Sequence, residues 1–166
     1  RVKGVYAIGD CVRGPMLAHK GSEEGVMVAD LICGEIAEMN YDVIPSVLYT
    51  NPEIAWTGKT EAEVKESGIA YKTGQFPFMA SGRAKAMEQT SGFVKIISAE
   101  EDDEILGVHI VGPMAGELIS EAVLALEFSA STEDIQRTIH AHPSLAEAVH
   151  EAALAVDGKA LNFPNR

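Results

Sequence analysis

The central part of the chain consists of short β-prone runs separated by turn residues. Val, Ile, Tyr, Trp and Phe dominate the runs, and Asn-Pro or Gly stands at the breaks, which is the pattern of strands joined by short connections. Between the second and third runs, Thr60 and Glu63 form a capping box and Gly68 suits a helix C-terminus, so a short helix is expected there. The predicted strands are residues 46–50, 53–58, 71–78, 93–97 and 105–110.

From residue 115 onward, the spacing of apolar residues becomes that of helices. Leu, Ile, Ala and Val recur on one helical face between residues 115 and 128. A second helix is expected at Ser131, where Asp134 stands three residues further on, and a third follows Pro143. Strands followed by helices predict an α+β domain over residues 46–166, with an antiparallel sheet and a helical layer.

The first 45 residues have a different organisation. An apolar run, Val5 to Ile8, predicts a strand that Gly9-Asp10 closes, and a helix is expected over residues 20–38. A lone strand of parallel-sheet character cannot satisfy its ladder hydrogen bonds or bury both of its faces. We therefore expect residues 1–45 to be the C-terminal piece of an α/β domain whose body this sequence does not contain.

The net charge narrows the possible partners. Among the 166 residues, 25 acidic and 13 basic side chains give a formal charge of −12, which disfavours nucleic acid and suits a basic protein partner. The sequence contains no apolar run of membrane-helix length and no signal-peptide pattern, so no membrane is expected as a partner.

Cys11 and Cys33 are too few for a disulfide scaffold, which favours a reducing compartment, and their spacing relative to the histidines supports no metal site.

The stretch HAHPSLAE, residues 140–147, places two imidazoles directly before a helix. Histidine is the side chain that most readily exchanges protons near neutral pH. Two interpretations of Glu147 are open. In the first, Glu147 and Ser144 form a capping box that closes the N-terminus of the helix. In the second, the carboxylate of Glu147 accepts a hydrogen bond from one ring nitrogen of His142, and the other ring nitrogen is free to act as a base. His140 lies two residues earlier in an extended segment and faces the opposite side, so only His142 is expected to act.

At the other end of the chain, Asp10 follows the expected strand and precedes the expected helix. A carboxylate outside the carboxyl end of a parallel strand is where α/β folds hold ligand hydroxyls. The backbone amides of residues 15–19, PMLAH, present the positive end of a helix dipole to an electron-rich ring or an anion. The alternative is an ordinary βα loop, since Gly-Asp is a common turn pair.

Taken together, the segments VYAIGDC, GPMLAHKGSEEG and HAHPSLAEA resemble the dihydrolipoamide dehydrogenase family of flavin-dependent disulfide oxidoreductases. The resemblance covers essentially the whole chain but only the C-terminal portion of that family's length. It implies that residues 1–45 belong to an FAD-binding domain, in which Asp10 holds the flavin ribityl chain. The residues implied to line the flavin ring are Met16, Leu17, Ala18 and His19.

The same resemblance implies roles for the HAHPSLAE stretch. The histidine that matches His142 is the base that deprotonates a dihydrolipoyl thiol, oriented by the glutamate that matches Glu147. It acts on the active site of the partner subunit, across a twofold dimer interface formed by residues 46–166. Many relatives have Thr where this chain has Ser144, which keeps the hydroxyl.

For the whole enzyme, the resemblance implies that electrons pass from dihydrolipoamide through a cysteine pair and FAD to NAD. The sequence contains neither a Gly-x-Gly-x-x-Gly loop nor a Cys-x-x-x-x-Cys pair, so the chain alone is expected to be inactive. The implied partners are a second copy of the chain, a lipoyl domain, and the subunit-binding domain of an acyltransferase in a 2-oxo acid dehydrogenase complex. The implied location is the cytoplasm, or the mitochondrial matrix in a eukaryote.

Two other interpretations stay open. One is a non-catalytic module for homodimerisation and docking, and the other is the same domain of a different flavin disulfide reductase. The chain ends in NFPNR without a terminal cysteine pair, which disfavours a mercuric reductase. The stretch GPMLAHKGSEEG resembles the lipoamide branch of the superfamily rather than the glutathione reductase branch.

Overall fold

The computed structural model describes residues 2–165 and divides into two compact units, Arg1–Ile44 and Pro45–Arg166. The boundary expected between the two domains lies between residues 45 and 46. The outermost residues of the expected domains, Arg1 and Arg166, lie outside the described residues. The assignment of the first unit to an FAD-binding domain stays a prediction.

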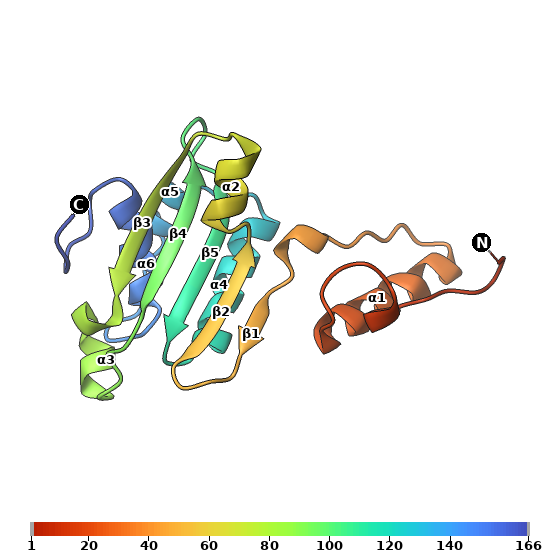
Figure 1. Ribbon diagram of the computed structural model, residues 1–166, viewed down its shortest axis with the longest axis horizontal. Helices are drawn as coiled ribbons and strands as arrows, with labels where there is room; N and C mark the ends of the chain where they lie inside the picture. The colour runs from red at the N-terminus through yellow and green to blue at the C-terminus, as the bar shows by residue number, and fades with distance from the viewer. Residues whose placement is uncertain (1, 166) are drawn as a thin grey trace. The chain divides into compact units, whose positions relative to one another are not determined.

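The second unit is built on a single five-stranded sheet (Figure 1). The order of the strands is β1-β2-β5-β4-β3 and every neighbouring pair is antiparallel. Because β4 and β5 are joined directly, they form the hairpin expected from the sequence, and β5 takes the central place in the sheet. The strands are β1 (Ser46–Leu48), β2 (Glu53–Gly58), β3 (Tyr71–Pro77), β4 (Phe93–Ala99) and β5 (Ile105–Gly112).

Helices cover one face of this sheet. Helix α4 (Ala115–Glu127) packs on β2 and β5, and α6 (Glu147–Val156) packs on β3 and β4. The short helix α5 (Thr132–Arg137) lies between them in sequence and packs against α6. The sheet and the helical layer confirm the predicted α+β class. The remaining helical segments of this unit are α2 (Glu61–Ser67), η3 (Phe78–Ala80) and α3 (Gly82–Ala86).

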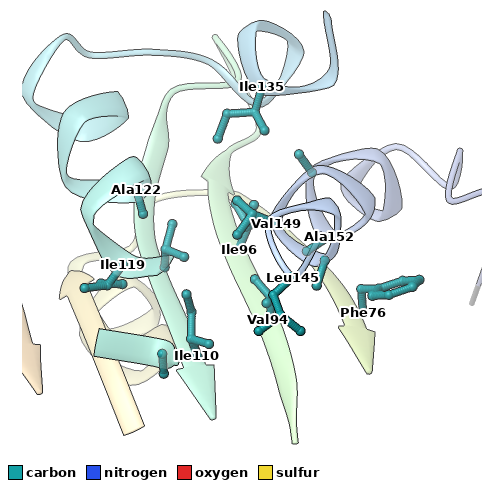
Figure 2. Close-up of a cluster of buried hydrophobic side chains, with 14 of the residues drawn as sticks. Phe76, Val94, Ile96, Ile110, Ile119, Ala122, Ile135, Leu145, Val149 and Ala152 are labelled. Carbon is teal, nitrogen blue, oxygen red and sulfur yellow. The ribbon is translucent and has the colours of Figure 1, made fainter. Parts of the chain in front are cut away.

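The hydrophobic core lies between the helices and the sheet (Figure 2). The registers place Ala55 opposite Ile110, Ile110 opposite Val94 and Val94 opposite Phe76, so one row of side chains crosses four strands. All four are at least 98% buried. At Gly74 a Cβ atom would lie 2.2 Å from the carbonyl oxygen of Ala152 and 2.4 Å from the backbone nitrogen of Val156, so only glycine lets α6 approach β3 this closely. The helical side of the core includes Ile119 and Ala122 of α4, Val149 and Ala152 of α6, and Leu145 just before α6.

Two of the three helix N-terminal motifs expected from the sequence are present as capping boxes. Thr60 with Glu63, and Ser131 with Asp134, each form a complete capping box, as predicted. The third helix differs, because α6 begins at Glu147 rather than directly after Ser144. Among residues 2–165, no helix is both long and apolar enough to cross a membrane.

The first unit contains one helix, α1 (Ala18–Cys33), and the 3-10 turns η1 (Gly9–Cys11) and η2 (Tyr41–Val43). The predicted strand at Val5 to Ile8 was wrong. These residues are extended, but a strand requires a ladder partner, and the part of the chain that the structure describes provides none for them. The predicted helix over residues 20–38 was misplaced, since Gly34 adopts a left-handed conformation, with φ of 87°, and ends α1 at Cys33.

Candidate functional site

The connection from α5 to α6, residues 138–146, carries His142 beside the first residue of α6. The Nδ1 atom of His142 lies 2.8 Å from Oε1 of Glu147. The other carboxylate oxygen of Glu147 accepts a 2.8 Å hydrogen bond from the backbone N–H of Ser144, whose hydroxyl in turn accepts from the Glu147 N–H at 3.3 Å. The peptide bond between His142 and Pro143 is cis. One oxygen of Glu147 therefore contacts the ring of His142, and the other accepts from Ser144 in a turn just before α6, whose N-cap residue is Ala146 and has no side-chain cap among the described residues. The role of His142 as a base stays a prediction.

This arrangement determines which nitrogen of His142 is available for chemistry. An ionised carboxylate only accepts hydrogen bonds, so the Nδ1 atom facing it must carry a proton. In the neutral ring the lone pair then resides on Nε2. The side chain of His142 is 77% exposed, whereas that of Glu147 is 29% exposed. The geometry thus presents an oriented proton acceptor at the surface of this unit.

The electrostatics of Glu147 favour the ionised carboxylate. Burial raises the pKa of Glu147, but the hydrogen bonds from the Ser144 N–H and from His142, together with the charges of His142 and His140, outweigh burial and lower its pKa overall. The carboxylate is therefore charged at neutral pH and stabilises the imidazolium that forms when His142 takes up a proton.

His140 makes its hydrogen bonds to groups other than Glu147. Its side chain is 5% exposed, its Nε2 atom lies 2.6 Å from Oε1 of Glu121 in α4, and its Nδ1 atom lies 2.9 Å from the carbonyl oxygen of Thr138. Its ring stacks on that of His150, with 4.9 Å between centroids and 19° between planes. Sequence reasoning missed Glu121, because it stands 19 residues before His140 and only tertiary packing brings the two together.

The other two histidines of the second unit have structural hydrogen bonds. The Nε2 atom of His150 lies 3.0 Å from the carbonyl oxygen of Gln136, at the end of α5. The Nε2 atom of His109 lies 3.1 Å from the carbonyl oxygen of Lys59, and burial lowers the pKa of His109 below its usual value. Within the described residues, the hydrogen-bond partner of each of these imidazoles is a backbone carbonyl, whereas that of His142 is a carboxylate.

In the first unit, the turn that carries Asp10 is held from within by a buried ion pair. Lys20 Nζ lies 3.2 Å from Glu24, and the two side chains are 0% and 2% exposed. Lys20 also donates to the carbonyl oxygen of Gly9 at 2.9 Å, and Glu24 accepts from the Gly9 N–H at 2.6 Å. Burial raises the pKa of Glu24, but hydrogen bonds from Gly9, Tyr41 and Lys20 outweigh it and lower the pKa overall.

The residues predicted to bind a ligand take no part in the hydrogen bonds between Lys20, Glu24 and Gly9 described above. Asp10 is exposed in η1, and the N-terminus of α1 follows after a loop. Within the described residues, no side chain caps α1 at its first position, and Met16 is 75% exposed just before it. The structure thus places Asp10 and the residues predicted to line a flavin ring at the two ends of the loop that leads into α1. Of those four, Met16, Ala18 and His19 are exposed and Leu17 is half-buried.

The two free cysteines, Cys11 and Cys33, are both exposed. Across residues 2–165 there is no group of three or more His, Cys, Asp or Glu side chains arranged to hold a metal ion.

Comparison with known proteins identifies the second unit. A family model described as "Pyridine nucleotide-disulphide oxidoreductase, dimerisation domain" matches residues 44–153. The chain is 57% identical over 163 residues to a dihydrolipoyl dehydrogenase from Cupriavidus necator and 55% identical over 162 residues to the mitochondrial dihydrolipoyl dehydrogenase of Pisum sativum. Each comparison covers 98% of this chain but only 34% and 32%, respectively, of the relative, so the chain spans about a third of the length of these relatives.

Solved structures show the same fold. The crystal structure of LpdA from Mycobacterium tuberculosis superposes with a TM-score of 0.85 at 29% sequence identity, over 90% of this chain and 33% of that one.

Proposed function

The chain belongs to the pyridine nucleotide-disulphide oxidoreductase family through its dimerisation domain, and we propose that it is the C-terminal part of a dihydrolipoyl dehydrogenase. In this proposal, residues 1–45 are the last piece of the FAD-binding domain and residues 46–166 are the dimerisation domain. The whole enzyme oxidises dihydrolipoamide with NAD as the final electron acceptor.

The observation that carries this proposal is the 2.8 Å hydrogen bond between His142 and Glu147. A dihydrolipoyl thiol gives its proton to Nε2 of His142: the S–H bond breaks, an N–H bond forms, and a thiolate and an imidazolium result. Glu147 stays ionised, keeps the proton on Nδ1 and stabilises the imidazolium. Because the His142 side chain is 77% exposed in this chain, it can approach a thiol on another subunit and afterwards release the proton to water.

Residues at the start of the first unit fit part of an FAD molecule. An exposed carboxylate, Asp10, on a turn held by the buried Lys20–Glu24 pair suits the hydroxyls of a ribityl chain. The exposed apolar Met16 and the uncapped start of α1 suit the edge of a flavin ring, and we assign Leu17, Ala18 and His19 to the same surface. When bound, FAD supplies the two-electron carrier between the dithiol and NAD. We assign no residue of this chain to NAD.

We further propose that the enzyme is a homodimer in which His142 serves the partner subunit's active site. Exposed apolar side chains of the dimerisation domain, such as Leu124, Phe128 and Ile139, support burial against another chain. The lipoyl domain that bears dihydrolipoamide and the subunit-binding domain of an acyltransferase are the proposed partners, and the charge of −12 favours basic surfaces on them. The proposed location is the cytoplasm, or the mitochondrial matrix in a eukaryote.

The test is the formation of NADH from NAD and dihydrolipoamide by the protein that carries this chain. Replacing His142 by Gln should lower turnover by about a hundred- to ten-thousand-fold, the usual contribution of a general base, with FAD content unchanged. His109→Gln is the matched control, since it removes another imidazole of the same domain and should leave turnover unchanged. Full turnover in the His142 variant would refute the mechanism. Turnover with other disulfide substrates but not with dihydrolipoamide would favour a different flavin disulfide reductase.

A further inference from the structure

The ring of His140 has a hydrogen-bond partner at each nitrogen, and both partners are acceptors. Nδ1 lies 2.9 Å from the carbonyl oxygen of Thr138, and Nε2 lies 2.6 Å from a carboxylate oxygen of Glu121. A carbonyl oxygen has no proton to give, and an ionised carboxylate has none either. A neutral imidazole carries one N–H and satisfies only one of these contacts, whereas an imidazolium satisfies both.

The surroundings of the ring support the charged form. The only other way to complete both contacts is a proton on Glu121, but imidazole is a stronger base than a carboxylate, so the shared proton belongs on His140. Burial of the His140 side chain, which is 5% exposed, by itself disfavours a charged ring. The carboxylate of Glu121 lies 2.6 Å away and offsets that cost, and it is 34% exposed, so water helps to keep it ionised.

The ring of His140 also links the segment that carries His142 to the neighbouring helices. It bonds the carbonyl of Thr138, two residues before it, to Glu121 on α4, and it stacks on His150 of α6. His150 in turn bonds the carbonyl of Gln136, so two stacked rings anchor the C-terminal end of α5. Only Ala141 separates His140 from His142, so a backbone rotation that released His140 from Glu121 would also displace His142 from Glu147.

From these contacts we propose that His140, held as an imidazolium by Glu121, is a positioning residue that fixes the orientation of His142. This inference rests on the proposed role of His142 as the base. His140 touches no substrate in this account and acts only through the backbone of residues 138–142. Glu121 on α4, with His150 and Glu147 on α6, are the titratable groups that face it.

The charge state is tested by nitrogen NMR of the protein that carries this chain, labelled with ¹⁵N only at its histidines. The ring nitrogens of His140, identified from the spectrum of a His140→Gln variant, should both be protonated at neutral pH. In Glu121→Gln, the side-chain amide donates to Nε2, and His140 should have a proton on Nδ1 alone. A single protonated nitrogen on His140 in the unsubstituted protein would overturn the ion pair.

The positioning role is tested by kinetics on the same protein. Glu121→Leu removes the anchor and should lower kcat by several-fold, and by less than the roughly hundredfold minimum for loss of a general base, while KM and FAD content stay unchanged. Glu121→Gln keeps a hydrogen bond to a neutral His140 and should recover most of the loss. Glu117→Leu, an exposed position on the same helix, is the control and should have no effect.

An unchanged kcat in Glu121→Leu would refute the positioning role. So would a loss as large as that of His142→Gln, because His140 and Glu121 would then belong to the chemistry itself. If His142→Gln kept full turnover, the proposed base would fail and the positioning role with it, whereas the NMR result would still decide whether His140 and Glu121 form an ion pair.

Discussion

Replacing Glu147 by Gln tests how the carboxylate orients the base. Each oxygen of Glu147 accepts from a different N–H donor, one on His142 and one on Ser144. A glutamine offers one oxygen and one NH₂ group at the same place, so it can accept from only one of the two donors. If the oxygen faces Ser144, the NH₂ group faces Nδ1 of His142, the ring adopts the opposite tautomer, and Nε2 loses the lone pair that takes up the thiol proton. If the oxygen faces His142, the N–H of Ser144 is left opposite another donor.

The size of the effect follows from these contacts. A hydrogen bond to a charged group contributes about 1.5–3 kcal/mol, and each 1.36 kcal/mol corresponds to a factor of ten in rate, so kcat should fall by roughly ten- to a hundredfold. Because the His142 side chain is 77% exposed, water screens the interaction, and the lower end of that range is expected. Loss of the Ser144 contact should also lower the free energy of unfolding by about 1 kcal/mol.

The assay is steady-state turnover on dihydrolipoamide as a function of pH, with FAD content measured in parallel. The lowered pKa of Glu147 means that its contribution to stability is present above the ordinary glutamate pKa and is lost as the pH falls through the folded value. The stability difference between the variant and the parent protein should therefore shrink below about pH 4.5. Turnover equal to that of the parent protein, or as low as that of His142→Gln, would refute this reasoning.

Three further outcomes are expected. The 166-residue chain purified alone should be colourless and unable to reduce NAD with dihydrolipoamide, because it contains no phosphate-binding loops and no redox cysteine pair; bound FAD absorbance would contradict this. Light scattering should give the mass of a dimer formed through residues after 46, and a monomer mass at micromolar concentration would count against it. Asp157→Asn should cost about 1 kcal/mol of unfolding free energy at neutral pH. Hydrogen bonds from Lys159, Gln136 and Lys72 lower the pKa of Asp157 to about 2, so urea titrations should show that difference vanish as the pH falls from about 4 towards 2.

Most of the dimerisation domain could be predicted from sequence because its signals are local. Strands β2 and β4 are β-prone runs bounded by turn residues, and the Thr60–Glu63 and Ser131–Asp134 boxes lie within four consecutive residues each. The Ser144–Glu147 contacts were also foreseeable, but α6 starts only at Glu147, since residues 144–146 form a turn stabilised by the same hydrogen bonds.

The features that the sequence did not reveal depend on partners far along the chain. An apolar run such as Val5 to Ile8 becomes a strand only beside another strand, and local pattern cannot report whether one is present. The buried Lys20–Glu24 pair has helical spacing typical of a surface pair, and it is internal because the turn at Gly9, the carbonyl of Arg13 and the side chain of Tyr41 pack around it. The His140–Glu121 contact likewise requires α4 and the α5–α6 connection to be packed together.

The assignment of His142 as the base is tested most directly by the rate at which dihydrolipoamide reduces the protein that carries this chain, measured in a single turnover without oxygen. His142→Gln should lower this rate constant by about a hundred- to ten-thousand-fold, Glu147→Gln by less, and His140→Gln by least, with equal FAD content in all three. Reduction of the same variants by NADH should be unaffected, because that half of the reaction does not use the thiol base. A loss in His140→Gln as large as that in His142→Gln would contradict the assignment.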